Sequence, residues 1–299
     1  MANKRFIYDE YGIVSADFVN IDLANDNRKF LNPYNIGLLT HPVAIKATEV
    51  AVHFFEQVRQ ELLRGCVTRA EYLFCNRLTE PKELCFGYAE KGIVGKGIHE
   101  LAQYVINQIY YINNHLIHEI KRIEDIKLFV DNIGDDRVSD IYANVIRGVL
   151  LEYTEQQCNM YGIPLKRMQS KPFWDITTSS WVRTNRLHFI WAGDGNVKLL
   201  VPKCFIGGTT FTYSKLNSKV ILSEIAHEEL LNPDSSIIRQ RKDKTQYVTK
   251  KDIRQQLSRH NITLNKEFAR NFASTHKGCT EQLRAEMDKQ RKKKGVQFR

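Results

Sequence analysis

Two long segments of the chain carry apolar side chains at helical spacing, and each stripe needs a partner surface. Between His41 and Arg64 the apolar residues fall at positions 43, 47, 50, 51, 54, 55 and 58. Between Ile98 and Leu116 they recur at steps of three and four. An amphipathic helix is stabilised mainly by burying such a stripe, so the sequence predicts a helix-rich body. Further helices are expected over 68–75, 126–132, 137–160 and 218–231.

The pattern changes after about residue 185. Arg186–Trp191 and Val197–Pro202 are runs of strand formers on either side of the sequence Ala-Gly-Asp-Gly-Asn. A Gly/Asp/Asn turn between two such runs is typical of a β-hairpin. Short strands are also expected over Phe18–Leu23 and 210–213. The predicted fold class is therefore α+β, with a helix-rich N-terminal body (1–165), a region containing a small antiparallel sheet near residues 186–213 (166–236), and a basic helical C-terminal segment (237–299).

Positive charge gathers at the C-terminal end of the chain. Residues 239–299 hold 18 Lys or Arg and six Asp or Glu, a net charge of +12. The whole chain carries +10, so the other 238 residues carry −2. Such a distribution indicates a polyanionic partner, either nucleic acid or an acidic membrane surface. The alternative is a solvated helical face followed by a charged tail.

The sequence gives three indications of cellular location. No stretch approaches the roughly 18 apolar residues needed to cross a bilayer. The first residues, MANKRFIYDEYG, contain no apolar run typical of a secretory signal. None of the six cysteines forms a CxxC pair, which favours reduced thiols. We therefore expect a cytoplasmic protein without a transmembrane segment.

A candidate metal site lies in the predicted helix after Gly134. Asp136, Asp140 and Asn144 occupy positions i, i+4 and i+8, so their side chains line one edge of a helix. Mg²⁺ binds one or two carboxylates together with water and substrate phosphate, which makes these residues candidate ligands, with Asp136 and Asp140 catalytic. Arg137 could instead balance the two carboxylates, and the Gly-Asp-Asp sequence at Gly134 also suits a tight corner between helices.

A glycine-rich segment precedes the helix expected from Ile98. Gly92, Gly95 and Gly97 would allow close backbone approach to an anion, and Lys96 adds positive charge. The order GxxGxG differs from the dinucleotide fingerprint, and no Lys-Ser/Thr follows as in a Walker A loop. These residues are therefore candidates for a phosphate cradle or for a simple turn.

Lys203 ends the second strand of the expected hairpin. Metal-dependent nucleases often use a lysine at a strand end, next to the carboxylates that hold the metal. Their signature has an acidic residue two positions earlier, where this chain has Val201. Lys203 is therefore either a catalytic lysine or an ordinary exposed side chain.

The basic segment contains two predicted helices of helix-turn-helix length, over 250–259 and 265–276. The first begins with a capping box in which Asp252 follows Thr249. We expect phosphate contacts from Arg254, Arg259, Lys266, Arg270 and Lys277, and possible base contacts from Gln255, Asn265 and Asn271.

Three functions are compatible with these features. The first is a nucleic-acid-processing enzyme, a Mg²⁺-dependent nuclease in a bacterial antiviral defence or mobile-element setting. The second is a non-catalytic DNA- or RNA-binding module whose body binds a partner protein or a second copy of the chain. The third is a nucleotide-responsive protein that uses the glycine-rich segment.

Overall fold

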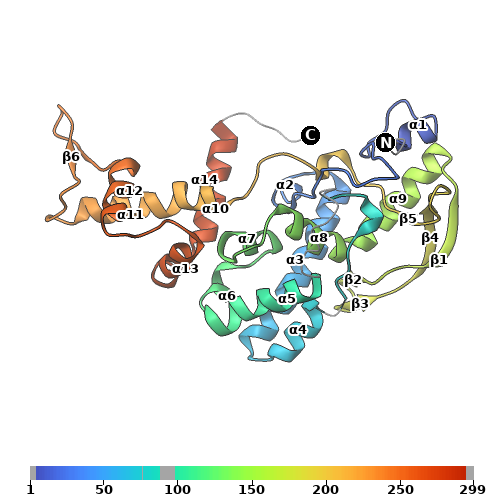
Figure 1. Cartoon of the computed structure of the whole chain (residues 1–299), viewed down its shortest axis with the longest axis horizontal. Coiled ribbons are helices and arrows are strands. Elements are labelled where there is room, and N and C mark those ends of the chain that lie inside the picture. The colour runs from blue at the N-terminus through green and yellow to red at the C-terminus, as the bar shows by residue number, and fades with distance from the viewer. Residues whose placement is uncertain (1–4, 76, 88–97, 294–299) are drawn as a thin grey trace.

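The computed structural model describes residues 5–75, 77–87 and 98–293. It confirms a helix-rich α+β fold, in which small antiparallel sheets accompany a large set of helices (Figure 1). The helices of the N-terminal part are α1 (Ile7–Glu10), α2 (Pro33–Ile36), α3 (Pro42–Leu63), α4 (Val67–Cys75), η1 (Lys82–Leu84), α5 (Ile98–Ile106), η2 (Asn107–Ile112), α6 (Leu116–Glu119), η3 (Ile123–Asp125), α7 (Ile126–Phe129), α8 (Asp135–Val145) and α9 (Arg147–Tyr161). The strands are β1 (Leu165–Gln169), β2 (Phe173–Asp175), β3 (Ser180–Val182), β4 (Asn185–Ile190), β5 (Val197–Lys198), β6 (Arg239–Gln240) and β7 (Gln246–Tyr247). The later helices are η4 (Lys203–Phe205), α10 (Tyr213–Leu216), η5 (Asn217–Ile221), α11 (Leu222–Leu231), α12 (Lys250–Arg259), α13 (Lys266–Thr275) and α14 (Cys279–Lys293).

Helix α3 is the centre of the body, as its apolar spacing predicts. Its buried side chains include Phe54, Phe55 and Val58, and α3 packs against α4, α8 and α9. Phe54 makes edge contacts with Trp174 of β2 and Trp181 of β3, at centroid distances of 5.1 and 5.3 Å. Such aromatic contacts add to the burial of apolar area, so they fix the β2–β3 hairpin on the helical core.

The predicted hairpin is confirmed as β4 and β5, which pair antiparallel with Phe189 opposite Lys198. The sequence did not reveal β1, which extends this sheet to the order β1-β4-β5. Strand β1 has the sequence LKRMQ and is largely exposed. Because neither of its faces is well buried, its sequence lacks the alternation of apolar and polar residues that identifies a strand. Strands β2 and β3 were also missed, because they are only three residues long.

Two expected strands are absent from the described structure. Phe18–Leu23 is extended but makes only isolated bridges, Phe6 to Asp22 and Phe18 to Pro202. The expected strand over 210–213 ends at a helix start instead, because the Thr212 side chain accepts from Lys215 N and caps α10.

The long predicted helices are interrupted. The helix expected over 137–160 is two helices, α8 and α9, separated at Ile146, two residues before Gly148. The helix expected from Ile98 continues after Ile106 as the π-helical turn η2. The predicted end at Gly162 is confirmed, since this residue adopts φ +67° after α9.

Helices α11 and α12 and the β6–β7 hairpin project from one side of the body (Figure 1). We call residues 222–259 the arm. Within it, α11 packs against α12 and β7. The capping box of α12 is confirmed: Thr249 Oγ1 accepts from Asp252 N, and the Asp252 carboxylate accepts from Thr249 N.

The chain returns from the arm to the body through α13 and α14. Helix α13 packs against α6 and α7, and α14 packs against α6, α10 and η5. Glu119 of α6 caps the start of α14, because its carboxylate accepts from Gly278 N at 2.5 Å and Thr280 N at 3.0 Å. Arg284 of α14 pairs with the buried Glu124 and Asp125 of η3. These contacts attach the last two helices to the body.

No helix among the described residues has the length and apolar character needed to span a bilayer. All six cysteines are free thiols, and four of them are buried.

Candidate functional site

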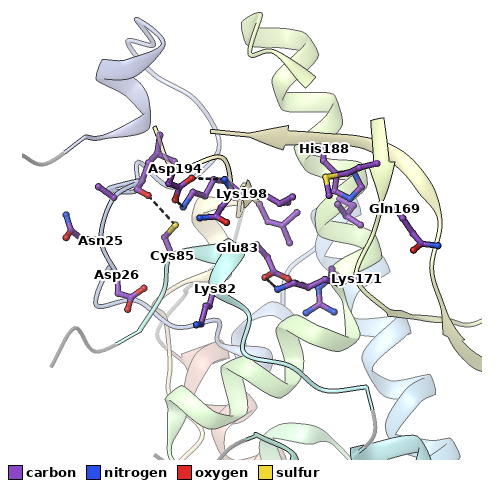
Figure 2. A pocket seen from close by; sticks show the side chains of 18 residues that line it. Asn25, Asp26, Lys82, Glu83, Cys85, Gln169, Lys171, His188, Asp194 and Lys198 are labelled. Atoms are coloured by element: carbon purple, nitrogen blue, oxygen red, sulfur yellow. Dashed lines mark hydrogen bonds and ion pairs between the residues drawn. The ribbon is translucent and has the colours of Figure 1, made fainter. Parts of the chain in front are cut away.

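The body contains a cavity of about 1020 Å³ beneath the β1-β4-β5 sheet (Figure 2). Five parts of the chain contribute to its wall: the segment before α2, the η1 region, helix α9, the end of β1 with the loop after it, and the β4–β5 hairpin. The lining side chains are Leu23, Ala24, Asn25, Asp26, Lys82, Glu83, Cys85, Arg147, Leu151, Met168, Gln169, Lys171, His188, Asp194, Asn196, Val197, Lys198 and Leu199. A cavity of this size could enclose a small molecule.

A buried ion network occupies one part of the cavity wall. Glu83 Oε1 accepts from Arg147 Nε at 2.8 Å, and Oε2 accepts from Lys171 Nζ at 2.6 Å. The side chains of Glu83 and Arg147 are only 4% and 2% exposed, whereas Lys171 is 48% exposed. Burial raises the pKa of Glu83, but the two cations outweigh burial and hold this pKa below its usual value. Glu83 is therefore a carboxylate at neutral pH.

A second ion pair lies in the β4–β5 hairpin. Lys198 Nζ donates to Asp194 Oδ2 at 2.8 Å and lies 5.4 Å from the centroid of the Trp191 ring. The Lys198 side chain is 7% exposed, so its ammonium group depends on these contacts. Cys85 is on the same side of the cavity (Figure 2), where burial raises the pKa of its thiol and Lys198 opposes that rise.

His188 presents one nitrogen for contact with a ligand. Its Nδ1 lies 2.9 Å from Arg186 O, and because a carbonyl oxygen can only accept, Nδ1 carries a proton. In the neutral ring Nε2 is then the acceptor. His188 is buried and lines the cavity.

Asn144, predicted as a metal ligand, instead makes hydrogen bonds to other protein groups in the structure. Its Oδ1 accepts from Thr79 N at 3.0 Å and Arg147 Nη2 at 2.8 Å, and its Nδ2 donates to Thr79 O and Asp140 O. Asn144 is fully buried, and its oxygen is already occupied. Its role is therefore to join α8 to Thr79 and Arg147.

Asp136 and Asp140 lie partly buried along one edge of α8, close enough for their charges to interact. Burial, then Glu80, then Asp136 raise the pKa of Asp140 to about 8, with Arg137 opposing the rise. Within residues 5–75, 77–87 and 98–293, no three His, Cys, Asp or Glu side chains are grouped as metal ligands. Mg²⁺ often takes only one or two protein carboxylates, so its binding by Asp136 and Asp140 stays a prediction.

Lys203 lies in η4, outside the sheet. It is exposed, its backbone N–H donates to Asp17 O, and its ammonium group lies 5.6 Å from the centroid of the Tyr8 ring. These surroundings differ from those of Asp140, so the structure shows no catalytic pairing of the two. Gly92, Gly95, Lys96 and Gly97 of the predicted phosphate cradle lie outside the described residues.

Two of the predicted phosphate ligands have structural roles. Lys266 Nζ donates to Val130 O at 2.5 Å, and Arg270 Nη1 donates to Phe129 O at 2.7 Å and Asp131 Oδ2 at 3.0 Å. Both cations thus satisfy carbonyl groups at the C-terminal end of α7, where the helix dipole favours positive charge. Sequence reasoning could not separate them from exposed cations, because the segment is basic throughout. Lys277 is exposed.

Arg254 and Arg259 lie on an exposed face of α12, as predicted. Together with Lys251, Gln255 and Ser258 they line a shallow groove of about 520 Å³. Their spacing of three and four residues places them on one side of the helix. Neither arginine makes an ion pair with any residue that the structure describes. The expected helix-turn-helix pairing is not formed, because α12 packs on α11 whereas α13 packs on α6 and α7.

The cavity residues were missed by sequence reasoning, although some carry a signal. Arg147 interrupts the apolar run Ala-Asn-Val-Ile-Arg-Gly-Val-Leu-Leu, and Lys198 begins Lys-Leu-Leu-Val. A lone cation inside an apolar run indicates a buried, paired charge. Its partners could not be identified, because Glu83 lies 64 residues from Arg147.

Comparison with known proteins places the body in a family. No curated protein and no solved structure matches the chain. Residues 10–214 match the family described as Domain of unknown function (DUF8370). This match includes every residue of the cavity wall and ends before the arm. Because it covers more than half of the chain, the protein belongs to the DUF8370 family.

Proposed function

We propose that this protein binds nucleic acid through the arm, with the α12 face in contact with phosphates. The observation that carries the proposal is the concentration of positive charge in the β6–β7 hairpin and α12, although Arg239 pairs with Asp252 and the whole arm carries only +2 because of the acidic residues in and after α11. Residues 237–260 contain eight Lys or Arg and two Asp or Glu, a net charge of +6. The arm's hairpin contributes Arg241, Lys242 and Lys244, which are all exposed.

The chemistry of the α12 face suits a phosphate backbone. Lys251, Arg254 and Arg259 supply the cations, and Gln255 and Ser258 supply neutral hydrogen-bond donors. Contacts of this kind displace condensed counterions, so affinity falls steeply with salt. Three phosphate contacts correspond to a slope of about −2.7 for log affinity against log salt on duplex DNA.

The test measures salt-dependent binding of the full chain to duplex DNA, duplex RNA and single strands by fluorescence anisotropy. In the double variant Arg254→Ala with Arg259→Ala, we expect weaker binding and a slope smaller in magnitude by about 1.8 on duplex DNA. The matched control removes two exposed cations from β1, Lys166→Ala with Arg167→Ala, and should retain the wild-type slope. Equal slopes for wild type and the α12 variant would exclude the α12 face as the contact surface.

A further inference from the structure

The acidic and the basic groups of the cavity differ in how many of their hydrogen bonds are made within the protein. This difference indicates what the cavity binds. Two of the three lining carboxylates already accept hydrogen bonds: Glu83 from Arg147 and Lys171, and Asp194 from Lys198 and from Asn196 N at 2.8 Å. The third, Asp26, is exposed. A carboxylate in this state has little need of another donor.

The ammonium groups are in the opposite state. Each lysine ammonium carries three N–H donors; Lys171 donates to the Glu83 carboxylate, and Lys198 donates to Asp194 and also contacts the Cys85 thiol and the Trp191 ring. Lys198 is almost fully buried, so its remaining donors can reach solvent or a ligand only through the cavity. The cavity wall therefore presents spare donors.

The charge balance of the wall agrees with this. Four cationic side chains (Lys82, Arg147, Lys171, Lys198) face three acidic ones (Asp26, Glu83, Asp194), which leaves one positive charge in excess. Electrostatic attraction inside a partly enclosed cavity is stronger than at an open surface, so this excess favours an anion.

Part of the remaining wall is apolar. Leu23, Leu151, Met168, Val197 and Leu199 line the same cavity as the lysines. An inorganic ion would leave these apolar side chains in contact with water, whereas the apolar part of an organic molecule would cover them. The volume of about 1020 Å³ accommodates such a molecule.

We propose that this cavity binds a small organic anion, in which a phosphate or carboxylate group meets Lys171 and Lys198 and an apolar body meets the leucine side of the wall. Figure 2 shows the two lysines on either side of Glu83. His188 Nε2 is an acceptor in the neutral ring, so it can meet an O–H or N–H donor of the ligand but not its anionic group. This site is independent of the arm and of nucleic acid.

The experiment compares three probes of similar size on the full chain by isothermal titration calorimetry: phenyl phosphate, benzoate and benzyl alcohol. We expect at least one anion to bind more tightly than the neutral alcohol. Tighter binding of phenyl phosphate identifies a phosphate site, and tighter binding of benzoate identifies a carboxylate site. Failure of both anions to bind, or equal binding of the neutral alcohol, would overturn the proposal.

Two variants test the location. Lys171→Gln removes a half-exposed ammonium group and should weaken anion binding about tenfold, the effect of one charge-assisted hydrogen bond. Lys166→Gln is the matched control, since this exposed lysine on β1 does not line the cavity, and it should bind like wild type.

Val197→Trp fills the apolar side without changing charge and should also weaken binding. Equal affinities in wild type, Lys171→Gln and Val197→Trp would place the probe elsewhere. None of these substitutions should alter nucleic-acid binding, so a failure of this proposal is distinguishable from a failure of the arm proposal.

Discussion

The cavity and the arm use the same residue types in opposite environments. In the cavity, Arg147 and Lys198 are buried and each is paired with a carboxylate. On the arm, Arg254 and Arg259 are exposed and have no acidic partner among the described residues. A buried cation must be paired because desolvation is costly, so a ligand in the cavity can use only the N–H donors that the pair leaves over, whereas an exposed cation is wholly available to a partner. The comparison teaches that environment, and not the number of basic residues, decides which cations can bind a ligand.

The largest expected effect is a loss of stability when the buried cation Arg147 is removed. Arg147→Ala leaves Glu83 buried with only Lys171, and also removes the donor to Asn144 Oδ1. Removing one partner of a buried pair typically lowers the free energy of unfolding by about 3–5 kcal/mol. Urea denaturation followed by circular dichroism measures the change.

Arg64→Ala provides the control for Arg147. Arg64 is 66% exposed and pairs with Glu61 at 3.5 Å, so its removal should cost less than about 1 kcal/mol. Similar losses in the two variants would contradict the assignment of Arg147 as a buried structural cation.

An intermediate effect is expected at Asp140, where burial and acidic neighbours raise the carboxyl pKa to about 8. The native state then binds a proton that the unfolded state has already lost, so this group lowers stability as pH rises from about 4 to about 8. Asp140→Asn should remove this loss and be more stable than wild type at pH 8. The advantage of Asp140→Asn should grow as pH rises through this interval.

Thermal melts between pH 5 and pH 8 check this prediction, with the exposed Asp9→Asn as control. A stability difference between wild type and Asp140→Asn that does not change with pH would contradict it. If Asp136 and Asp140 bind Mg²⁺, addition of Mg²⁺ at pH 8 stabilises wild type and leaves Asp140→Asn unchanged.

The smallest effect concerns the arm alone. Thr249→Ala removes the side-chain cap of α12 and should cost about 1 kcal/mol of local stability. Hydrogen exchange should show faster exchange in α12, while the amides of α3 keep wild-type rates. Thr249→Ser retains the hydroxyl and is the control. Loss of protection in α3 would show that arm and body unfold together.

Local patterns predicted much of the fold. The apolar spacing of α3, the turn between β4 and β5, and the capping box at Thr249 all depend on nearby residues, and all are confirmed. The break at Ile146 was not predicted, because the nearby Gly148 is a weak signal inside an otherwise apolar helical run and a single glycine is often tolerated in a helix.

The site was harder to predict than the fold. Asp136, Asp140 and Asn144 do follow one helical edge, but α8 becomes fully buried toward its C-terminal end, so Asn144 faces Thr79 and Arg147. The cavity depends on contacts between segments far apart in the chain, such as Glu83 with Arg147 and Lys171. Helical periodicity indicates which residues share a face, but it does not identify the segment that covers that face.

The cap that Glu119 provides to α14 bears on how shortened versions of this protein should be designed. The family match ends at residue 214, yet Glu119 accepts from the backbone of Gly278 and Thr280, and Arg284 pairs with Glu124 and Asp125. A truncated chain that stops at the family boundary would expose three acidic groups and the ring of Phe211, which lies 4.5 Å from the Arg284 guanidinium carbon. An expression plasmid for the body should therefore extend through α14, with any deletion confined to the arm.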